Sequence, residues 1–233
     1  MTELGHIVAL GGGGFSMEPD NPLLDDYALA ATGLDRPSVL FVPTAAGDSP
    51  SYVEAFHEAF AGRADLAWLS LFDRSGDLRE QVFAADLVYV GGGNTANLIA
   101  IWRAHGFDAI LRDAAASGVI LAGVSAGALC WFDSGVTDSF GPELGLLTGG
   151  LGFVGGAFSP HYGGNPVRRA LMHQYVGDGT LADAWAADDG CAIDFVDGAV
   201  HAVVSSRPEA RAHRIERTPG GVNERAVEPR YLG

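Results

Sequence analysis

The residues best suited to chemistry in this chain are Gly123-Val124-Ser125-Ala126-Gly127, a G-x-S-x-G sequence. An apolar run, Val119–Val124, leads into it, and residues compatible with a helix follow it. In that context a G-x-S-x-G forms a nucleophile elbow, a sharp strand-to-helix turn that exposes the serine hydroxyl beyond the sheet. The alternative is an ordinary glycine-rich turn. The flanking strand and helix favour Ser125 as a nucleophile.

A serine nucleophile needs a base, and the base needs an orienting acid. Of the seven histidines, His161 is the best candidate, because Ser159-Pro160-His161-Tyr162 is a short constrained segment after a glycine-rich stretch. The other six lie where structural or solvated histidines are expected. The residues alone leave the acid open, since five carboxylates lie in or beside loops of the second half: Asp133, Asp138, Glu143, Asp188 and Asp189.

Two glycine-rich loops follow expected strands. Gly91–Gly93 would bring backbone amides beside a developing oxyanion, together with the amide of Ala126 after the nucleophile. The alternative is that these glycines only allow two backbones to pack closely. Gly11–Gly14 lies where a Rossmann fold keeps its phosphate loop. It lacks the last glycine of G-x-G-x-x-G and a clear strand-end acid for a ribose, which disfavours dinucleotide binding.

The elements that must position these residues alternate through the first half of the chain. Strands are expected at Gly5–Leu10, Ser38–Val42, Leu66–Phe72, Leu87–Val90 and Val119–Val124. Helical patterns cover Pro22–Thr32, Ser49–Phe60, residues 95–104 and Phe107–Ser117. Continuous apolar strands between helices predict an α/β fold whose mostly parallel central sheet is covered on both faces.

The second half changes character. Phe140–Ala157 has strand or loop character, and Pro166–Val176 is expected to be a helix. Further strands are expected at Trp185–Ala187, in a hairpin of Cys191–Val196 with Ala199–Ser205, and in a last hairpin around Pro219–Gly221. No repeat or linker interrupts the chain, so we expect one domain over residues 1–233.

Composition excludes several classes of function. The formal charge of −15 argues against a nucleic-acid partner. All fourteen basic side chains are arginine, which rules out a Schiff-base or P-loop lysine and leaves guanidinium groups to bind carboxylates. The two cysteines form no C-x-x-C, so we expect no metal site. Without a secretory signal or an apolar run of membrane length, we expect a cytoplasmic protein that does not bind membranes. Exposed apolar strands in the second half would favour a homo-oligomer.

Five motifs together resemble the peptidase E family of aspartyl dipeptidases, with cyanophycinase as a more distant relative. They are Ile7–Gly14, Phe41–Asp48, Val90–Thr95, Gly123–Ala128 and Ser159–Tyr162, and the similarity runs over most of the chain. The resemblance implies a three-layer α/β sandwich like class I glutamine amidotransferases, with serine in place of their cysteine. It also implies a cofactor-free serine peptidase that removes N-terminal aspartate from short peptides.

Carried over by motif, Ser125 resembles the family's nucleophile and His161 its base, with Gly92 or Gly93 and Ala126 as the oxyanion hole. Asp189-Gly190 matches the family's acid-glycine step, and Asp138 matches a second acidic position near the site. Arg168 or Arg169 is the nearest match to the arginine that binds the substrate's aspartyl carboxylate. Asn94, in the Gly-Gly-Gly-Asn motif, and Asp138 are further candidates for substrate binding. The loop between His161 and Arg168 is shorter than in the better-known enzymes, which questions a strict aspartate preference.

Two other classes of function stay open at this point. A relative that kept the fold without the activity would serve as a binding protein. A different acyl-transfer chemistry, such as amidotransfer or ester hydrolysis, is the other alternative. Amidotransferases of this fold use a cysteine nucleophile, and Cys130, five residues after Ser125, is expected to face the core.

Overall fold

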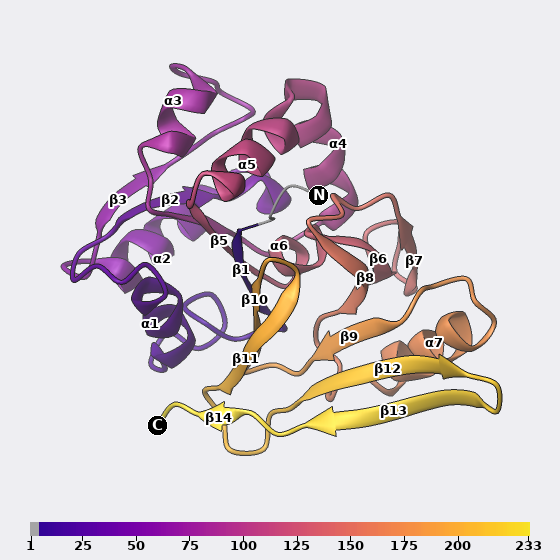
Figure 1. Ribbon diagram of the computed structural model, residues 1–233. Coiled ribbons are helices and arrows are strands. Elements are labelled where there is room, and N and C mark those ends of the chain that lie inside the picture. The colour runs from indigo at the N-terminus through magenta and orange to yellow at the C-terminus, as the bar shows by residue number, and fades with distance from the viewer. Residues whose placement is uncertain (1–4) are drawn as a thin grey trace.

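The computed structural model describes residues 5–233, which form two β-sheets with helices packed against them (Figure 1). The first sheet has eight strands. In order across the sheet they are β14 (Arg230–Tyr231), β11 (Ala199–Ser205), β10 (Cys191–Val196), β1 (His6–Leu10), β5 (Ile120–Val124), β4 (Leu87–Val90), β2 (Ser38–Val42) and β3 (Asp65–Trp68).

The centre of this sheet is parallel, because β1, β5, β4, β2 and β3 all run in one direction. β10 and β11 extend it as an antiparallel hairpin beside β1. Every residue of β4 is buried, as expected for a strand covered on both faces. The predicted ends of β2, β4, β10 and β11 are those observed, because β2 and β4 are short apolar runs and the Asp197-Gly198 turn delimits β10 and β11.

Helices cover both faces of the first sheet. The helices of this sheet are α1 (Leu23–Ala30), α2 (Pro50–Phe60), α3 (Leu78–Phe83), α4 (Thr95–His105), α5 (Phe107–Ala116) and the short α6 (Ala126–Leu129). α1 and α2 pack on one face, where Val8 shares a buried cluster with Phe56. α3, α4 and α5 pack on the other, where Ile7 shares a cluster with Trp102. The sheet and the helices on its two faces thus form three layers, and the sheet is mixed but largely parallel (Figure 1).

A second sheet of six strands was not expected from the sequence, which predicts a single central sheet. Its strands, in order, are β13 (Gly221–Val227), β12 (Ala212–Thr218), β9 (Ala184–Ala187), β8 (Val154–Ser159), β6 (Phe132–Thr137) and β7 (Gly145–Thr148). α7 (Pro166–Gly177) packs against it. Glycines within β6 and β8, and a register shift between these two strands, hide the alternating pattern that would have predicted the sheet.

The expected strand at Leu66–Phe72 ends earlier, at Trp68. The Ser70 hydroxyl accepts hydrogen bonds from the amides of Phe72 and Asp73, so the chain turns there although Leu69 and Leu71 stay buried. The helix α3 follows this turn and was not predicted because it is only six residues long. No helix within residues 5–233 is long and apolar enough to cross a lipid bilayer.

Candidate active site

Ser125 lies at a sharp turn between β5 and α6. Its backbone has φ 56° and ψ −110°, a region that residues with a side chain rarely adopt. The turn is closed by the two flanking glycines: a Cβ on Gly123 would lie 2.2 Å from the Gly127 carbonyl oxygen, and one on Gly127 would lie 2.3 Å from that of Val90. These contacts explain the glycines of G-x-S-x-G as a steric requirement of the turn.

The structure brings Ser125, His161 and Asp189 together in one hydrogen-bonded chain. Ser125 Oγ lies 2.7 Å from His161 Nε2, and His161 Nδ1 lies 2.5 Å from Asp189 Oδ1. Because the carboxylate only accepts, Nδ1 carries the proton and leaves Nε2 to accept from the serine hydroxyl. The hydrogen bond from His161 holds the pKa of Asp189 below its usual range, which keeps the carboxylate ionised.

The loop Gly11–Gly14 after β1 supports the histidine and the aspartate. The amide of His161 donates to the Gly11 carbonyl, and that of Gly190 donates to the Gly12 carbonyl, each at 3.0 Å. A Cβ on Gly12 would lie 2.0 Å from Asp189 Oδ1, so only glycine fits there. Sequence reasoning missed this role, although four consecutive glycines after a strand were its visible signal.

Of the glycines expected to supply oxyanion donors, Gly92 lies beside Ser125. A Cβ on Gly92 would lie 3.5 Å from the Ser125 Cβ, and the Gly92 amide donates to the Tyr52 hydroxyl at 3.0 Å. Within residues 5–233 the amides of Gly93 and Ala126 have no hydrogen-bond acceptor. Gly93 has φ 139°, and a Cβ there would lie 2.2 Å from the Ala45 carbonyl oxygen. Tyr52, which carries no signal in the sequence, therefore anchors the loop Gly91–Gly93 through the amide of Gly92.

Two polar residues expected near the substrate, Asn94 and Asp138, contact other groups of the protein. The Asn94 side chain caps α4 by accepting from the Asn97 amide at 2.8 Å and donates to the Ser139 carbonyl at 2.9 Å. Asp138 has a 63% exposed side chain whose Oδ2 lies 3.9 Å from Arg168 Nη2. The carboxylate that contacts His161 is that of Asp189.

Arg168 and Arg169, which the family resemblance suggests for binding the substrate carboxylate, contact groups of the protein itself. Arg168 is 5% exposed, and its Nη1 donates to the Val136 carbonyl at 2.8 Å. Burial lowers the pKa of Arg168, while the nearby Asp138 raises it. Arg169 pairs with Glu224 at 2.9 Å. Neither arginine lines the cavity that contains Ser125.

That cavity has a volume of about 570 Å³ and opens beside Ser125, His161 and Gly92. Its apolar wall is formed by Phe15, Met17, Pro19, Tyr52, Ala55 and Val124. Burial raises the pKa of Tyr52, so its phenol stays neutral where it accepts from Gly92. The volume lies within the range usual for small-molecule sites.

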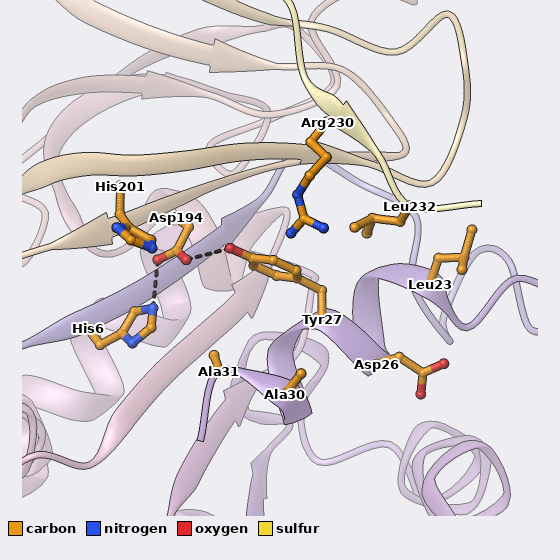
Figure 2. Close-up of a pocket in the computed structure, with 10 residues that line it drawn as sticks. All are labelled: His6, Leu23, Asp26, Tyr27, Ala30, Ala31, Asp194, His201, Arg230 and Leu232. Atoms are coloured by element: carbon orange, nitrogen blue, oxygen red, sulfur yellow. Dashed lines mark hydrogen bonds and ion pairs between the residues drawn. The ribbon is translucent and has the colours of Figure 1, made fainter. Parts of the chain in front are cut away.

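A cavity of similar size, about 520 Å³, contains none of these three residues (Figure 2). In it the buried Asp194 accepts from the Tyr27 hydroxyl at 2.6 Å and lies 2.7 Å from His6 Nε2. The Arg230 guanidinium lies 5.8 Å from the centre of the Tyr27 ring. Figure 2 shows Asp194 between Tyr27 and His6, and no serine or cysteine is among the residues that line this cavity.

The cysteine alternative lacks a reactive thiol. Cys130 is completely buried in α6's C-terminal turn, and its Sγ lies 3.2 Å from the Gly127 carbonyl oxygen. Burial raises the pKa of Cys130 well above its usual value, so the thiolate is disfavoured. In the part of the chain that the structure describes, no group of three or more His, Cys, Asp or Glu residues could hold a metal ion.

Comparisons with known proteins agree on one family. Residues 7–203 match the model of peptidase family S51. The chain is 46% identical over 230 residues to the uncharacterized peptidase YgaJ of Bacillus subtilis (strain 168), an alignment that covers 98% of this chain and 99% of that protein.

Solved structures share the fold at low identity. A peptidase from an acI-B1 Actinobacterium is 18% identical with a TM-score of 0.70, over 97% of this chain and 94% of that one. A Listeria monocytogenes EGD-e protein described as a peptidase E candidate is 17% identical with a TM-score of 0.59, over 96% and 99%. At these identities the likeness concerns the fold alone.

Proposed function

The chain belongs to peptidase family S51, a family of serine peptidases, and we propose that it hydrolyses short peptides with Ser125, His161 and Asp189 as its catalytic triad. The observation that carries this proposal is the unbroken chain of hydrogen bonds from the Ser125 hydroxyl through His161 to Asp189. It begins at a strained strand-to-helix turn, where a nucleophile is expected.

In the proposed mechanism, His161 Nε2 takes the hydroxyl proton while Ser125 Oγ attacks the carbonyl carbon of the scissile peptide bond. The tetrahedral intermediate then collapses, the C–N bond breaks, and His161 gives the proton to the leaving amine. Water hydrolyses the resulting acyl-enzyme with His161 again as the base. Asp189 keeps the imidazole in the productive tautomer and stabilises the imidazolium that forms.

The negative charge of the intermediate would be stabilised by the amides of Gly93 and Ala126. Two observations support this: neither amide has an acceptor within the described residues, and Ala126 directly follows the nucleophile. Gly92 has a different part in the proposal. Its amide is engaged by Tyr52, so it fixes the loop that carries Gly93.

The narrower form of this proposal is a dipeptidase that removes N-terminal aspartate, as the family resemblance implies. An aspartyl carboxylate needs a cationic partner, because an unpaired buried carboxylate is strongly disfavoured. Arg168 would serve only if its guanidinium exchanged the Val136 carbonyl and Asp138 for the substrate. A panel of dipeptides tests this form directly.

The deciding experiment measures hydrolysis of Asp-Leu, Glu-Leu, Leu-Leu and isoaspartyl-Leu by the wild-type protein and by Ser125→Ala. Loss of the nucleophile should lower kcat by at least about 10⁴-fold on every substrate that is cleaved. Ser117→Ala, on the exposed C-terminal end of α5, is the matched control and should keep full activity. Equal hydrolysis by Ser125→Ala and the wild type would remove the serine mechanism.

A chemical probe separates the serine from the cysteine alternative. A fluorophosphonate should label the wild-type protein at Ser125 and abolish hydrolysis, whereas iodoacetamide should leave hydrolysis intact because Cys130 is completely buried. The reverse pattern would favour a thiol mechanism.

A further inference from the structure

Resting on the proposed function, we propose that the cavity beside Ser125 binds a large apolar side chain next to the scissile bond, such as that of leucine, methionine or phenylalanine. This assigns a substrate class different from N-terminal aspartate. The argument depends on what lines the cavity, on which charges lie near it, and on its size.

One wall of the cavity is the segment Phe15–Pro19, which is held as a compact turn. The amides of Met17 and Glu18 both donate to the Gly14 carbonyl, at 3.1 Å and 2.8 Å. Phe15 is 4% exposed and stacks on Tyr52 with ring centroids 5.4 Å apart. This wall is therefore an ordered apolar surface.

The adjoining part of the wall comes from α2, which presents Tyr52 and Ala55 to the same space. Ala55 leaves room that a larger residue at this helical position would fill. Met17 is 48% exposed at the rim, where its sulfur accepts from the Gly13 amide at 3.2 Å and its side chain adds polarizable apolar surface. Together the walls offer apolar contact to a long side chain without fixing one shape.

Charge around the cavity disfavours a carboxylate. Its lining residues include no Arg, Asp or Glu. Behind the Phe15 wall lies the buried Asp25, whose Oδ1 would be 2.9 Å from a Cβ on Gly14. The nearest motif-matched cation, Arg168, is bound to the Val136 carbonyl and lies outside the lining. An aspartyl side chain would lose its water here and gain no cation.

The size of the cavity also fits a large side chain. About 570 Å³ has room for a large side chain together with part of the peptide backbone, and a larger apolar side chain covers more of the apolar lining than a glycyl or alanyl residue does. When an apolar side chain fills the cavity, apolar surface of both the side chain and the cavity lining is removed from water. Large apolar residues should therefore gain most of the available binding energy.

The first test compares kcat/KM of the wild-type protein on Leu-Gly, Gly-Leu, Asp-Gly, Gly-Asp and Gly-Gly. One of the two leucine dipeptides should exceed Gly-Gly and both aspartyl dipeptides by at least about tenfold. Which leucine dipeptide is preferred tells whether the acyl or the leaving residue occupies the cavity. A preference for Asp-Gly, or equal rates for leucine and glycine substrates, would overturn the proposal.

The second test changes the cavity itself. Met17→Lys places a cation at its rim and Ala55→Leu reduces its volume, and each should lower the ratio of kcat/KM for the preferred leucine dipeptide to that for Gly-Gly at least about fivefold. Leu34→Lys, an exposed leucine after α1, is the matched control and should leave the ratio unchanged. Thermal unfolding verifies that each variant is folded. Unchanged ratios in both folded cavity variants would refute the assignment.

The outcomes separate this proposal from the one on which it rests. If Ser125→Ala retains activity, the serine mechanism fails whatever the substrate preference. If Ser125→Ala is inactive and leucine dipeptides are not preferred, the mechanism stands and only the assignment of the cavity fails.

Discussion

Replacing Gly12 by alanine tests whether the first glycine-rich loop, Gly11–Gly14, supports the proposed catalytic pair His161 and Asp189. Gly12 does not have a positive φ, so its backbone accepts alanine without strain. The added methyl carbon would lie 2.0 Å from Asp189 Oδ1 and 2.8 Å from His161 Nδ1. Non-bonded carbon atoms approach oxygen no closer than roughly 3 Å, so the carboxylate must move by about 1 Å.

A shift of that size removes the hydrogen bond that now measures 2.5 Å between His161 and Asp189. Loss of the orienting aspartate lowers kcat by about 10⁴-fold in a serine triad. Because the methyl group displaces the carboxylate and does not delete it, we expect kcat to fall by about 10²- to 10⁴-fold. The steric strain should lower the free energy of unfolding by only about 1–3 kcal/mol, so the protein should remain folded.

The assay is steady-state hydrolysis of the best dipeptide by Gly12→Ala, with urea unfolding measured in parallel. Gly145→Ala is the matched control, because a Cβ at Gly145 in β7 would meet no atom within 4 Å and its φ is not positive. It should keep wild-type kcat. A folded Gly12→Ala protein with more than a third of the wild-type kcat would refute the supporting role of this loop.

Two further substitutions test charges at and behind the site. Asp189→Asn should lower kcat about 10⁴-fold by favouring the wrong His161 tautomer, whereas Asp138→Asn, at an exposed carboxylate, should change it less than threefold; the opposite ranking would make Asp138 the acid. Burial raises the pKa of Asp25 to about 6, about 2 units above an exposed aspartate, which corresponds to about 3 kcal/mol. Because the folded pKa is the higher one, the wild type should lose that stability as pH rises from about 4 to 6. At pH 8 the Asp25→Asn variant should therefore be more stable than the wild type by up to about 3 kcal/mol in urea unfolding, and at pH 4 it should be no more stable than the wild type. A difference between the two proteins that does not depend on pH would contradict this.

The parallel half of the fold could be predicted because its strands are buried on both faces. Such strands appear as short continuous apolar runs, and Ser38–Val42 and Leu87–Val90 have the ends that the sequence predicts. The second sheet could not be predicted in the same way. Val154–Ser159 contains two glycines and pairs with irregular register, so its burial depends on neighbours that are distant in the sequence.

The members of the site differ in how far the sequence specified them. Ser125 was indicated by its local pattern, because the elbow is a local structure. The acid was left open by the residues alone, and only the family resemblance pointed to Asp189 first. Asp189 lies in the loop between β9 and β10, so its distance to His161 follows from how these strands pair with β8 and β1, which are distant in the sequence. Tyr52 had no signal at all, since its contact with Gly92 joins α2 to the loop after β4.

Gly11–Gly14 shows why a run of glycines after a strand is ambiguous on sequence alone. A loop that binds phosphate directs its backbone N–H groups at the anion. Here the amide of Gly11 donates to the Cys191 carbonyl and that of Gly13 to the Met17 sulfur, so those amides are engaged within the protein. The carbonyls of Gly11 and Gly12 accept from the segments that carry His161 and Asp189. The same four glycines thus pack closely against the segments that carry His161 and Asp189. The direction of the peptide groups, which no sequence pattern records, distinguishes this use from phosphate binding.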